Sequence, residues 1–521
     1  MAPSVLRLAG LQNDRLTLYL ELLFAVILLT LLLLRRRTRD TPLPPGPRGS
    51  MISGHRKEMA TTRRIWEQYA GWAKIYGPIF SLKSNNIDVV ILNNARTAHT
   101  LLDKRSNIYS DRPRSVMGSE LCDMGKMFFR IRSQHPWFSA YRRMAHEDFG
   151  ALQIPRHASG IQTNIQQLLK SLLSDPQGLR DHLRLCQGQS ILMATYGYQV
   201  KSKDDQFLLL AEERLRLANA FLRPGMWLVD SYPILKYWPS WMPGGGFRKI
   251  ASEVKSRTEE SLASTMEWTK AELSAGTALP SFVEGQLNRQ ALGNDRNEEM
   301  IGYVASSMYV AGADTVISTV LTFLLMMTLN PDIQKRAQQE IDIIIGRDRL
   351  PQISDRERLP YVEAVVREVF RFHPVAPLGV PHSVIRDDIF DGMLIPSGSI
   401  VIANIWGLTH DESIYPDPMR FNPDRFYSGE AKQGESQPNP LKYVFGFGRR
   451  VCAGMHFAEA SVFLHVASLL ATFNILKAVD ENGMEIIPVI NFTDGIVSKP
   501  EDFPCRIEPR PDAVDLILSS N

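Results

Sequence analysis

Residues 299–329 are apolar around nearly the whole circumference when they are drawn as a helix. Such a helix would be about 45 Å long at the standard rise per residue, and a helix that is hydrophobic on every side is buried. The chain has 521 residues, of which 44% are hydrophobic and 22% charged. These values are typical of large packed proteins and exclude a disordered or coiled-coil chain. We therefore expect a folded protein built around this central helix.

The middle of this segment is polar, which is unexpected for a buried helix. It reads Ala311-Gly312-Ala313-Asp314-Thr315, and an unpaired carboxylate or hydroxyl in an apolar interior costs several kcal/mol. Gly312 lacks a side chain, so a ligand or another backbone could approach closely there. An alternative is a helix kink in which the Thr315 hydroxyl bonds back to a carbonyl one turn earlier. The residues alone leave both interpretations open.

Helical patterns dominate the remaining sequence, at residues 156–173, 333–345, 361–371 and 455–472. Short strand-like runs occur at residues 89–92 and 400–402. Beyond residue 47 there is no second linker and no internal repeat, and the loosest stretch is 428–439. The fold class predicted from pattern is therefore mainly α with small β-sheets, in one large domain at residues 50–521.

A second long apolar segment lies at residues 16–34, after a short tail at residues 1–15. It is long enough to cross a bilayer core as a helix. Arginines follow it at positions 35, 36, 37 and 39, and the side richer in basic residues normally stays cytoplasmic. We therefore predict an uncleaved transmembrane anchor rather than a secretory signal or a core helix. Residues 35–49, basic and then rich in proline, would form a stiff hinge between the anchor and a cytosolic domain.

Charge and cysteine usage exclude several classes of protein. The 59 Lys and Arg residues nearly balance the 56 Asp and Glu residues, whereas a nucleic-acid-binding domain is expected to be markedly basic. The four cysteines are widely spaced and form no Cys-x-x-Cys pair: Cys122, Cys186, Cys452 and Cys505. Neither a disulfide framework nor a zinc cluster is therefore indicated, and a reducing compartment is expected.

Residues 445–454 form a glycine-rich loop around one cysteine, just before the helical pattern at 455–472. Glycines on both sides let a flat ligand approach the Cys452 sulfur, because no Cβ intervenes. Backbone N–H groups at the helix start, with Arg449 and Arg450, would favour the thiolate over the thiol. Cys452 is thus a candidate soft ligand or nucleophile, although a lone cysteine is more often a small buried side chain. The glycine spacing does not fit a dinucleotide-binding loop.

This loop matches the pattern Phe-x-x-Gly-x-Arg-x-Cys-x-Gly at every defined position, and so resembles the haem-ligating signature of the cytochrome P450 superfamily. The other landmarks of that family follow in the same order: residues 311–315 in the long helix, Glu368 and Arg371 in a Glu-x-x-Arg pair, and Arg425 within Pro423-Asp424-Arg425-Phe426. The resemblance extends from the N-terminal anchor to the C-terminus. Its anchor and hinge are similar to those of the microsomal type, and its overall sequence is similar to that of fungal secondary-metabolite members.

The resemblance implies roles for particular residues. Cys452 would ligate the iron of haem b, and a thiolate ligand favours cleavage of the O–O bond. Asp314 and Thr315 would be catalytic and relay protons during oxygen activation. The residues implied in cofactor binding, besides the cysteine, are Arg450, Phe445, Gly448, Gly454, Trp137, Arg142 and His382.

Two further implications concern charge inside the fold. Glu368, Arg371 and Arg425 would form a buried structural triad, whose loss would leave an unpaired charge in the interior. Tyr141 stands where family members usually have an arginine. We therefore expect at most a neutral hydrogen bond from Tyr141 to a haem propionate.

The resemblance also implies the reaction and the partners. It predicts a monomeric, membrane-anchored haem-thiolate monooxygenase in the endoplasmic reticulum, with a cytosolic domain, O2 as co-substrate and electrons from an NADPH-dependent flavoprotein reductase. Substrate-facing segments would be residues 117–129, 221–227, 309–310, 375–380 and 492–497. These are apolar, aromatic or rich in methionine, which suits a hydrophobic small molecule such as a terpenoid or a polyketide.

Two other functions remain compatible with these motifs. One is a haem-thiolate isomerase or dehydratase that needs no reductase, and the other is a membrane-tethered haem-binding or lipid-binding protein without catalysis. Both would leave Asp314 and Thr315 buried without a task, so a monooxygenase is the expected function.

Overall fold

The computed structural model describes residues 23, 26, 41–51, 53–210, 213, 226–293, 296–427, 437–511 and 513–519. The chain divides into a small unit, residues 1–43 with 389–394, and a large unit, residues 44–388 with 395–521. In the small unit the Leu394 N–H donates to the Pro42 carbonyl over 2.7 Å. The predicted tail at 1–15 lies outside the described residues, as does the predicted anchor at 16–34 apart from Leu23 and Val26.

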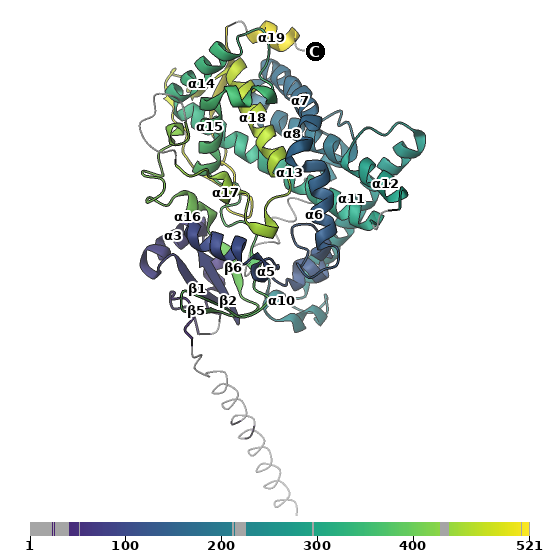
Figure 1. Ribbon diagram of the computed structural model, residues 1–521, viewed down its shortest axis with the longest axis vertical. Helices are drawn as coiled ribbons and strands as arrows, with labels where there is room; N and C mark the ends of the chain where they lie inside the picture. The colour runs from purple at the N-terminus through teal and green to yellow at the C-terminus, as the bar shows by residue number, and fades with distance from the viewer. Residues whose placement is uncertain are drawn as a thin grey trace, which may run out of the picture. The chain divides into compact units, whose positions relative to one another are not determined.

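Helices make up most of the large unit (Figure 1). The long ones are α3 (Ile65–Tyr76), α6 (Phe138–Phe149), α7 (Ile154–Ser174), α8 (Leu179–Tyr196), α11 (Gly246–Ala275), α12 (Phe282–Ala291), α13 (Glu298–Leu329), α14 (Pro331–Ile344), α15 (Pro360–Phe372) and α18 (Met455–Thr472). The short ones are α2 (Arg56–Thr61), α4 (Ala95–Ala98), α5 (Ser106–Tyr109), α10 (Leu228–Ser231), α16 (Ile405–Thr409), α17 (Leu441–Val444) and α19 (Ala513–Ser519). The five helices expected from the sequence are confirmed as α7, α13, α14, α15 and α18, each within two residues at either end.

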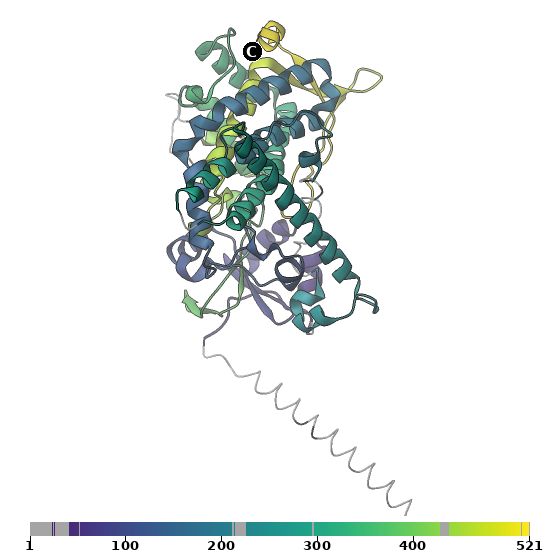
Figure 2. The same ribbon diagram turned by 90° about the vertical axis from the view of Figure 1, so that its right-hand side faces the viewer.

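The strands form small sheets, so the predicted fold class is confirmed. One sheet has the order β1 (Ile79–Ser84), β2 (Ile87–Leu92), β6 (Ile400–Ala403), β3 (His382–Ser383), and β2 pairs parallel with β6. The two runs expected to be strands are thus neighbours, with Val89 opposite Ile400. A second sheet contains β8 (Glu485–Ile486), β7 (Phe473–Val479) and β9 (Cys505–Pro509). It lies at the opposite end of the large unit from the first sheet (Figure 2). The hairpin β4 (Asp388–Phe390) and β5 (Met393–Ile395) is the third.

Part of the predicted hinge packs against the first sheet. The carbonyls of Pro44 and Pro45 accept hydrogen bonds from the Ser81 hydroxyl and N–H, over 2.6 and 2.8 Å. A Cβ on Gly46 would collide with the Ser81 carbonyl, so glycine is needed at this crossing. Residues 44–46 therefore lie along β1 rather than forming a free spacer.

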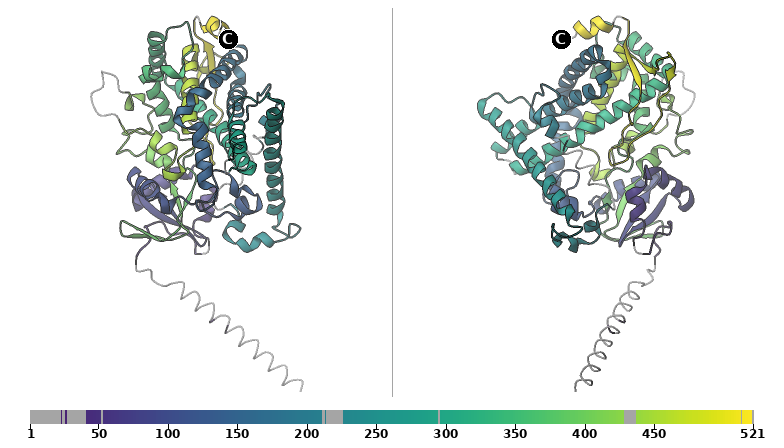
Figure 3. Two further views of the ribbon diagram at one scale, coloured as in Figure 1. Left: turned by 45° about the vertical axis from the view of Figure 1, so that its right-hand side comes forward. Right: turned by 180° about the vertical axis from the view of Figure 1, so that it is seen from behind.

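Helix α13 is the central helix that the sequence predicts. Its N-terminus is capped by Asn297, whose side chain accepts the Met300 N–H over 2.8 Å. Helices α8 and α18 pack along it (Figures 1 and 3). Within the described residues, α13 and α18 are long and apolar enough to cross a bilayer, but 67% and 72% of their most apolar stretches are buried inside the protein. Both are therefore helices of the core.

A buried ion pair connects α15 to the segment that contains the turn η8 (Pro423–Arg425). Arg371 donates two hydrogen bonds to Glu368, over 2.7 and 2.8 Å, and neither side chain is exposed. The Arg425 Nε lies 3.5 Å from the same carboxylate, which also accepts the Asn422 N–H over 2.8 Å. The structure thus brings together the three residues of the expected triad.

We predict that Arg371→Met destabilises the fold far more than Arg367→Met on the same helix. Loss of Arg371 leaves a buried carboxylate with its pairing incomplete, at a cost of about 3–5 kcal/mol. Arg367 pairs with Glu363, and both residues are half-buried. Arg356 also donates to the Glu363 carboxylate, so loss of Arg367 leaves that carboxylate paired and should cost no more than about 1 kcal/mol. Urea unfolding of the two variants measures the difference. Equal free energies of unfolding would show that the buried pair does not stabilise this region.

Candidate functional site

The loop before α18 is held in one shape by backbone contacts. The Cys452 N–H donates to the Phe445 carbonyl over 2.8 Å, and the Phe445 ring packs on Phe370 of α15 with centroids 5.5 Å apart. Gly446 and Gly448 have φ values of 77° and 52°, which favour glycine. The Gly448 N–H donates to the Asp103 carboxylate, and a Cβ on Gly448 would collide with the Leu102 carbonyl.

Gly454 has no such backbone reason to be glycine. Its φ is −92°, which any residue can adopt, and a Cβ there would meet no atom of the described chain within 4 Å. The space beside this glycine, two residues after Cys452, is therefore open. This arrangement suits the close approach of a flat ligand to the sulfur.

Cys452 differs from the other cysteines in its accessibility. Its side chain is exposed, unlike those of Cys122 and Cys186, which are buried, or Cys505, which is half-buried. Yet the protein surrounds the sulfur closely enough for burial to raise the pKa of the thiol, while the Gly454 N–H and Arg142 lower it. The free thiol is thus protonated, and ligation of a metal would release its proton.

This electrostatic result corrects the expectation that Arg449 and Arg450 favour the thiolate. Arg449 is exposed at the surface. The Arg450 guanidinium turns away and donates to the Ser110 and Ile131 carbonyls over 2.7 and 2.6 Å. Arg142 acts on the sulfur instead, and its Nη1 donates to the Val451 carbonyl over 2.7 Å.

The polar middle of α13 is accessible although the helix is otherwise buried. Ala311 is exposed and residues 312–315 are half-buried, between buried Val310 and Val316. The Thr315 hydroxyl donates to the Ala311 carbonyl over 2.9 Å, so the back-bonding that the alternative interpretation required is present. It leaves the lone pairs of the hydroxyl oxygen available to accept a hydrogen bond.

Asp314 has a partner that the sequence did not reveal. The Lys499 Nζ lies 3.4 Å from its carboxylate, and the lysine side chain is 40% exposed whereas the aspartate side chain is 16% exposed. Lys499 belongs to the segment after β8, and the Ser498 N–H beside it donates to the Val375 carbonyl over 2.8 Å. The pair therefore joins the accessible part of α13 to a more exposed cation.

Four arginines gather near the cysteine loop, and we call Arg112, Arg130, Arg142 and Arg450 the cation cluster. Arg112 donates to the Val380 and Pro381 carbonyls over 2.7 and 2.8 Å. Both Arg112 and Arg450 are buried. The Nε of Arg130 is buried without a hydrogen-bond partner among the described residues.

Two carboxylates, Asp111 and Asp230, lie near the cation cluster and offset part of its charge. Burial, and repulsion from the other three arginines, lower the pKa of Arg112 well below its ordinary value. Burial and Arg142 likewise lower the pKa of Arg450 to about 10. The Asp111 carboxylate offsets part of this repulsion. This carboxylate is already bound by Arg132, whose Nε donates to it over 2.9 Å. The four guanidinium groups thus outnumber these two carboxylates, and an anionic ligand would lower the free energy of burying them.

His382, Trp137 and Tyr141 differ in what they offer beside this cluster. The His382 Nδ1 donates to the Tyr109 carbonyl over 2.8 Å, and burial with Arg112 lowers the ring's pKa to about 3. The ring is therefore neutral and its other nitrogen is an acceptor, so it donates nothing to an anion. Trp137 is half-buried, with the Lys126 Nζ 5.5 Å from its ring centre. The Tyr141 hydroxyl is buried and has no hydrogen-bond partner in the described chain.

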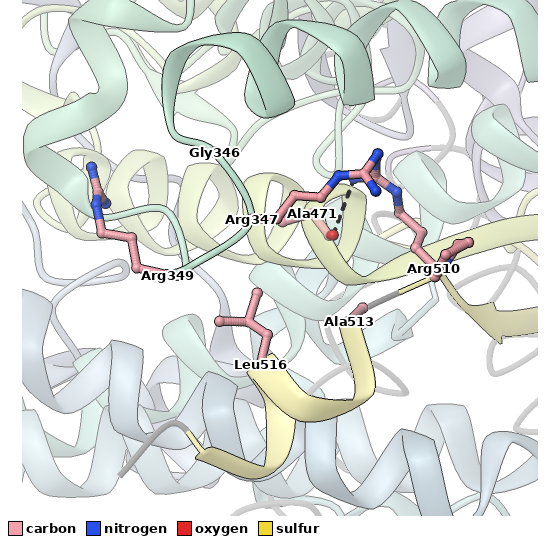
Figure 4. Close-up of a pocket in the computed structure, with 8 residues that line it drawn as sticks. Gly346, Arg347, Arg349, Ala471, Arg510, Ala513 and Leu516 are labelled. Atoms are coloured by element: carbon pink, nitrogen blue, oxygen red, sulfur yellow. Dashed lines mark hydrogen bonds between the residues drawn. The ribbon is translucent and has the colours of Figure 1, made fainter.

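A separate small pocket carries no comparable chemistry (Figure 4). It lies between α19 and the turn after α14, where Arg347, Arg349 and Arg510 line it, and its volume of about 10 Å³ holds roughly one water molecule. Arg347 and Arg510 both donate to Asp342, over 2.9 and 2.6 Å. Arg349 donates to Asp355 over 2.7 and 2.8 Å. These cations are already neutralised.

The family model described as "Cytochrome P450" matches residues 44–502 of the chain. The chain belongs to the cytochrome P450 family. It is also 41% identical to "Cytochrome P450 monooxygenase claR" of Ampulloclitocybe clavipes, over 91% of this chain and 87% of that protein. Identity to "Cytochrome P450 monooxygenase 208" of Postia placenta is 38%, over 97% and 98% of the two chains. Identity to "Cytochrome P450 monooxygenase ple1" of Rhodocybe pseudopiperita is 37%, over 90% of each. The protein is thus a haem-thiolate monooxygenase.

The residues of this cytochrome P450 fit a haem group. A haem carries two propionate carboxylates, which would pair with the guanidinium groups of the cation cluster. The accessible Cys452 sulfur and the open space beside Gly454 suit a flat iron macrocycle. Sequence reasoning missed Arg112 and Arg130, because no motif marks them and only the fold brings them beside Arg450.

The segments expected to face substrate differ in exposure. Val380 is 37% exposed and Val375 is half-buried. Tyr309 is buried and donates its hydroxyl to the Phe207 carbonyl over 3.0 Å, and Phe492 stacks on His373 with centroids 3.5 Å apart. These two rings therefore pack within the protein. Residues 221–225 of another expected segment lie outside the described chain.

Proposed function

We propose that this cytochrome P450 oxidises a hydrophobic small molecule, with Cys452 as the thiolate ligand of haem b. The observation that carries the proposal is a buried excess of positive charge, centred on Arg112 and Arg450, beside an exposed cysteine. When bound, haem supplies the activation of O2, one atom of which enters the substrate. The electrons come from an NADPH-dependent flavoprotein reductase.

In this proposal the protein holds the cofactor at two places. Cys452 binds the metal, and the glycines at 446 and 448 hold its loop in a shape that other residues adopt with strain. Arg112 and Arg450 neutralise the propionates, which lowers the free energy of burying their own charges. Arg130 and Arg142 add positive potential, and Trp137 supplies apolar contact. His382 fixes the backbone of Tyr109 through its hydrogen bond to the Tyr109 carbonyl.

Protons reach the reacting oxygen through α13. Lys499 is the more exposed group and holds the Asp314 carboxylate, so exchange with solvent starts there. Asp314 is adjacent to Thr315, whose hydroxyl hydrogen is directed at the Ala311 carbonyl, so the hydroxyl oxygen can accept a hydrogen bond. In the proposed proton path, Asp314 thus stands between the more exposed Lys499 and Thr315.

The substrate is a hydrophobic skeleton of the terpenoid or polyketide kind, in fungal secondary metabolism. Apolar residues such as Val375 and Val380 are accessible in a segment whose carbonyls bind Arg112, so the substrate region adjoins the cation cluster. Reductase docks on the cysteine side, where Arg143 and Arg449 are exposed.

The enzyme is anchored in the endoplasmic reticulum membrane by residues 16–34, with its catalytic domain in the cytosol. A second surface supports contact with a bilayer. Ile234, Tyr237 and Trp241 are 74%, 69% and 81% exposed. They belong to the segment that precedes α11 (Figure 3, left). Aromatic side chains with neighbouring lysines, here Lys236, are typical of a membrane interface.

The chain from residue 41 onward should sediment with lipid vesicles through this surface. Replacing Ile234 and Trp241 by Asp should weaken binding by at least about tenfold, or about 1.4 kcal/mol, because apolar burial in the interface is lost. The same change at Ile487 and Val489, which are 69% and 77% exposed elsewhere, is the matched control. Equal loss in both pairs would contradict a membrane surface at residues 234–241.

Product formation tests the proposed reaction. With a fungal reductase and a panel of terpenoid and polyketide skeletons, the wild type should add one oxygen atom, read by mass. Thr315→Val should keep consuming NADPH but divert most electrons to hydrogen peroxide. Asp314→Asn should slow turnover by about 100-fold, the lower range of a general acid's contribution.

Thr319→Val is the matched control for Thr315→Val. Thr319 lies one turn further along α13 and makes the same kind of back-bond, to the Thr315 carbonyl over 3.1 Å, but it is buried. It should leave the ratio of product to NADPH unchanged. If both valine variants behave alike, Thr315 has no special part in proton delivery.

A further inference from the structure

Four buried side chains linked by hydrogen bonds join α8 and α18 to the polar part of α13. The Cys186 sulfur of α8 lies 3.5 Å from the His465 Nε2 of α18, and the His465 Nδ1 lies 2.8 Å from the Ser461 carbonyl. The Ser461 hydroxyl donates to the Gln187 Oε1 over 3.2 Å. The Gln187 Nε2 donates to the carbonyl of Gly312 over 3.0 Å. All four residues are buried, with at most 2% of each exposed: Cys186, Gln187, Ser461 and His465.

The direction of each hydrogen bond is fixed by the groups involved. Burial lowers the pKa of His465 to about 4, so the ring is neutral. A carbonyl only accepts, so the hydrogen lies on Nδ1 and the Nε2 accepts from the Cys186 thiol, whose pKa burial raises. The donors form two short runs. One leads from Cys186 through His465 to the Ser461 carbonyl, and the other leads from the Ser461 hydroxyl through Gln187 to the Gly312 carbonyl. Within each run the bonds polarise one another.

Helix α8 contacts Gly312 twice. Besides the Gln187 amide, Ile191 one turn later packs on it, and a Cβ at Gly312 would lie 2.9 Å from the Ile191 Cδ1. The other end of the Gln187 amide is held by α18, which begins three residues after Cys452. One side chain thus connects the helix next to the cysteine ligand with the peptide unit two residues before Asp314.

We infer that Gln187 is a positioning residue for oxygen activation, which fixes the Gly312 carbonyl, and with it Asp314 and Thr315, relative to the helix that follows Cys452. The inference rests on the proposed function of the Asp314 and Thr315 pair. The Gln187 side chain bonds the Ser461 hydroxyl and the Gly312 carbonyl. It acts through the backbone of α13, where its amide is a second donor to a carbonyl at the glycine.

Gln187→Met tests this role, because methionine nearly keeps the volume of glutamine and removes both polar atoms. Gln334→Met is the matched control. Gln334 is also buried and donates its amide to the Ile475 carbonyl over 2.8 Å, but it lies on α14 against β7. Both haem-loaded variants are compared by amide hydrogen exchange of the peptide that covers residues 308–318, and by product and hydrogen peroxide formed per NADPH.

Gln187→Met should speed exchange in this peptide by roughly two- to tenfold, the range that one buried hydrogen bond supplies. Product per NADPH should fall by a similar factor while hydrogen peroxide rises. Gln334→Met should change neither. If the two variants match in exchange and in coupling, Gln187 only satisfies the core and the inference is wrong. A wild type that forms no oxygenated product overturns the proposed function instead, while the exchange result still judges Gln187.

Gln187→Glu serves where the methionine variant does not fold. Its carboxyl still accepts from Ser461, but it donates to the Gly312 carbonyl only when protonated. The protection factor of the 308–318 peptide should therefore match the wild type at low pH, and fall as the pH rises through the raised pKa of a buried glutamate. A protection factor that does not vary with pH beyond the wild-type change would contradict the inference.

Discussion

Positive charge buried beside a sulfur atom is the constraint on which this site depends. Arg112 and Arg450 lie in the interior, and the charges of the cation cluster oppose one another. Of the two carboxylates near the cluster, Asp111 is shared with Arg132 and Asp230 acts on Arg130. Unpaired charges in a protein interior cost several kcal/mol each, so under the proposed function the two haem propionates would also stabilise the fold. Haem is in this sense part of the folded protein, and its binding raises stability through linkage.

The same helices serve stability and chemistry. Helix α15 contains Glu368 and Arg371, and its Phe370 packs against Phe445 at the start of the cysteine loop. Helix α18 begins at the end of that loop, and its Ser461 reaches Gln187. Because these contacts are buried and directional, a change in the core alters the geometry around Cys452. Through this coupling, residues remote from the haem would change the amounts of product and hydrogen peroxide formed per NADPH.

Much of the fold could be predicted from periodicity and motif order. The limits of α13 and α18 followed from long, mainly apolar patterns, and the strands β2 and β6 from two short strand-like runs. Electrostatics could not be predicted in this way. Arg449 and Arg450 are next to the cysteine in sequence, yet Arg142 is the cation that acts on its sulfur, and burial outweighs it. Arg112 and Lys499 carry no local signal, since their partners Val380 and Asp314 lie 268 and 185 residues away along the chain.

The most direct measurement is the absorption spectrum of the haem-loaded, reduced protein after addition of carbon monoxide. Thiolate ligation by Cys452 predicts a strongly red-shifted Soret band in the wild type. It also predicts that Cys452→Ala abolishes this band, whereas Cys505→Ala, at the half-buried cysteine, retains it. An unshifted band in the folded wild type, or a red-shifted band that persists in Cys452→Ala, would contradict the account.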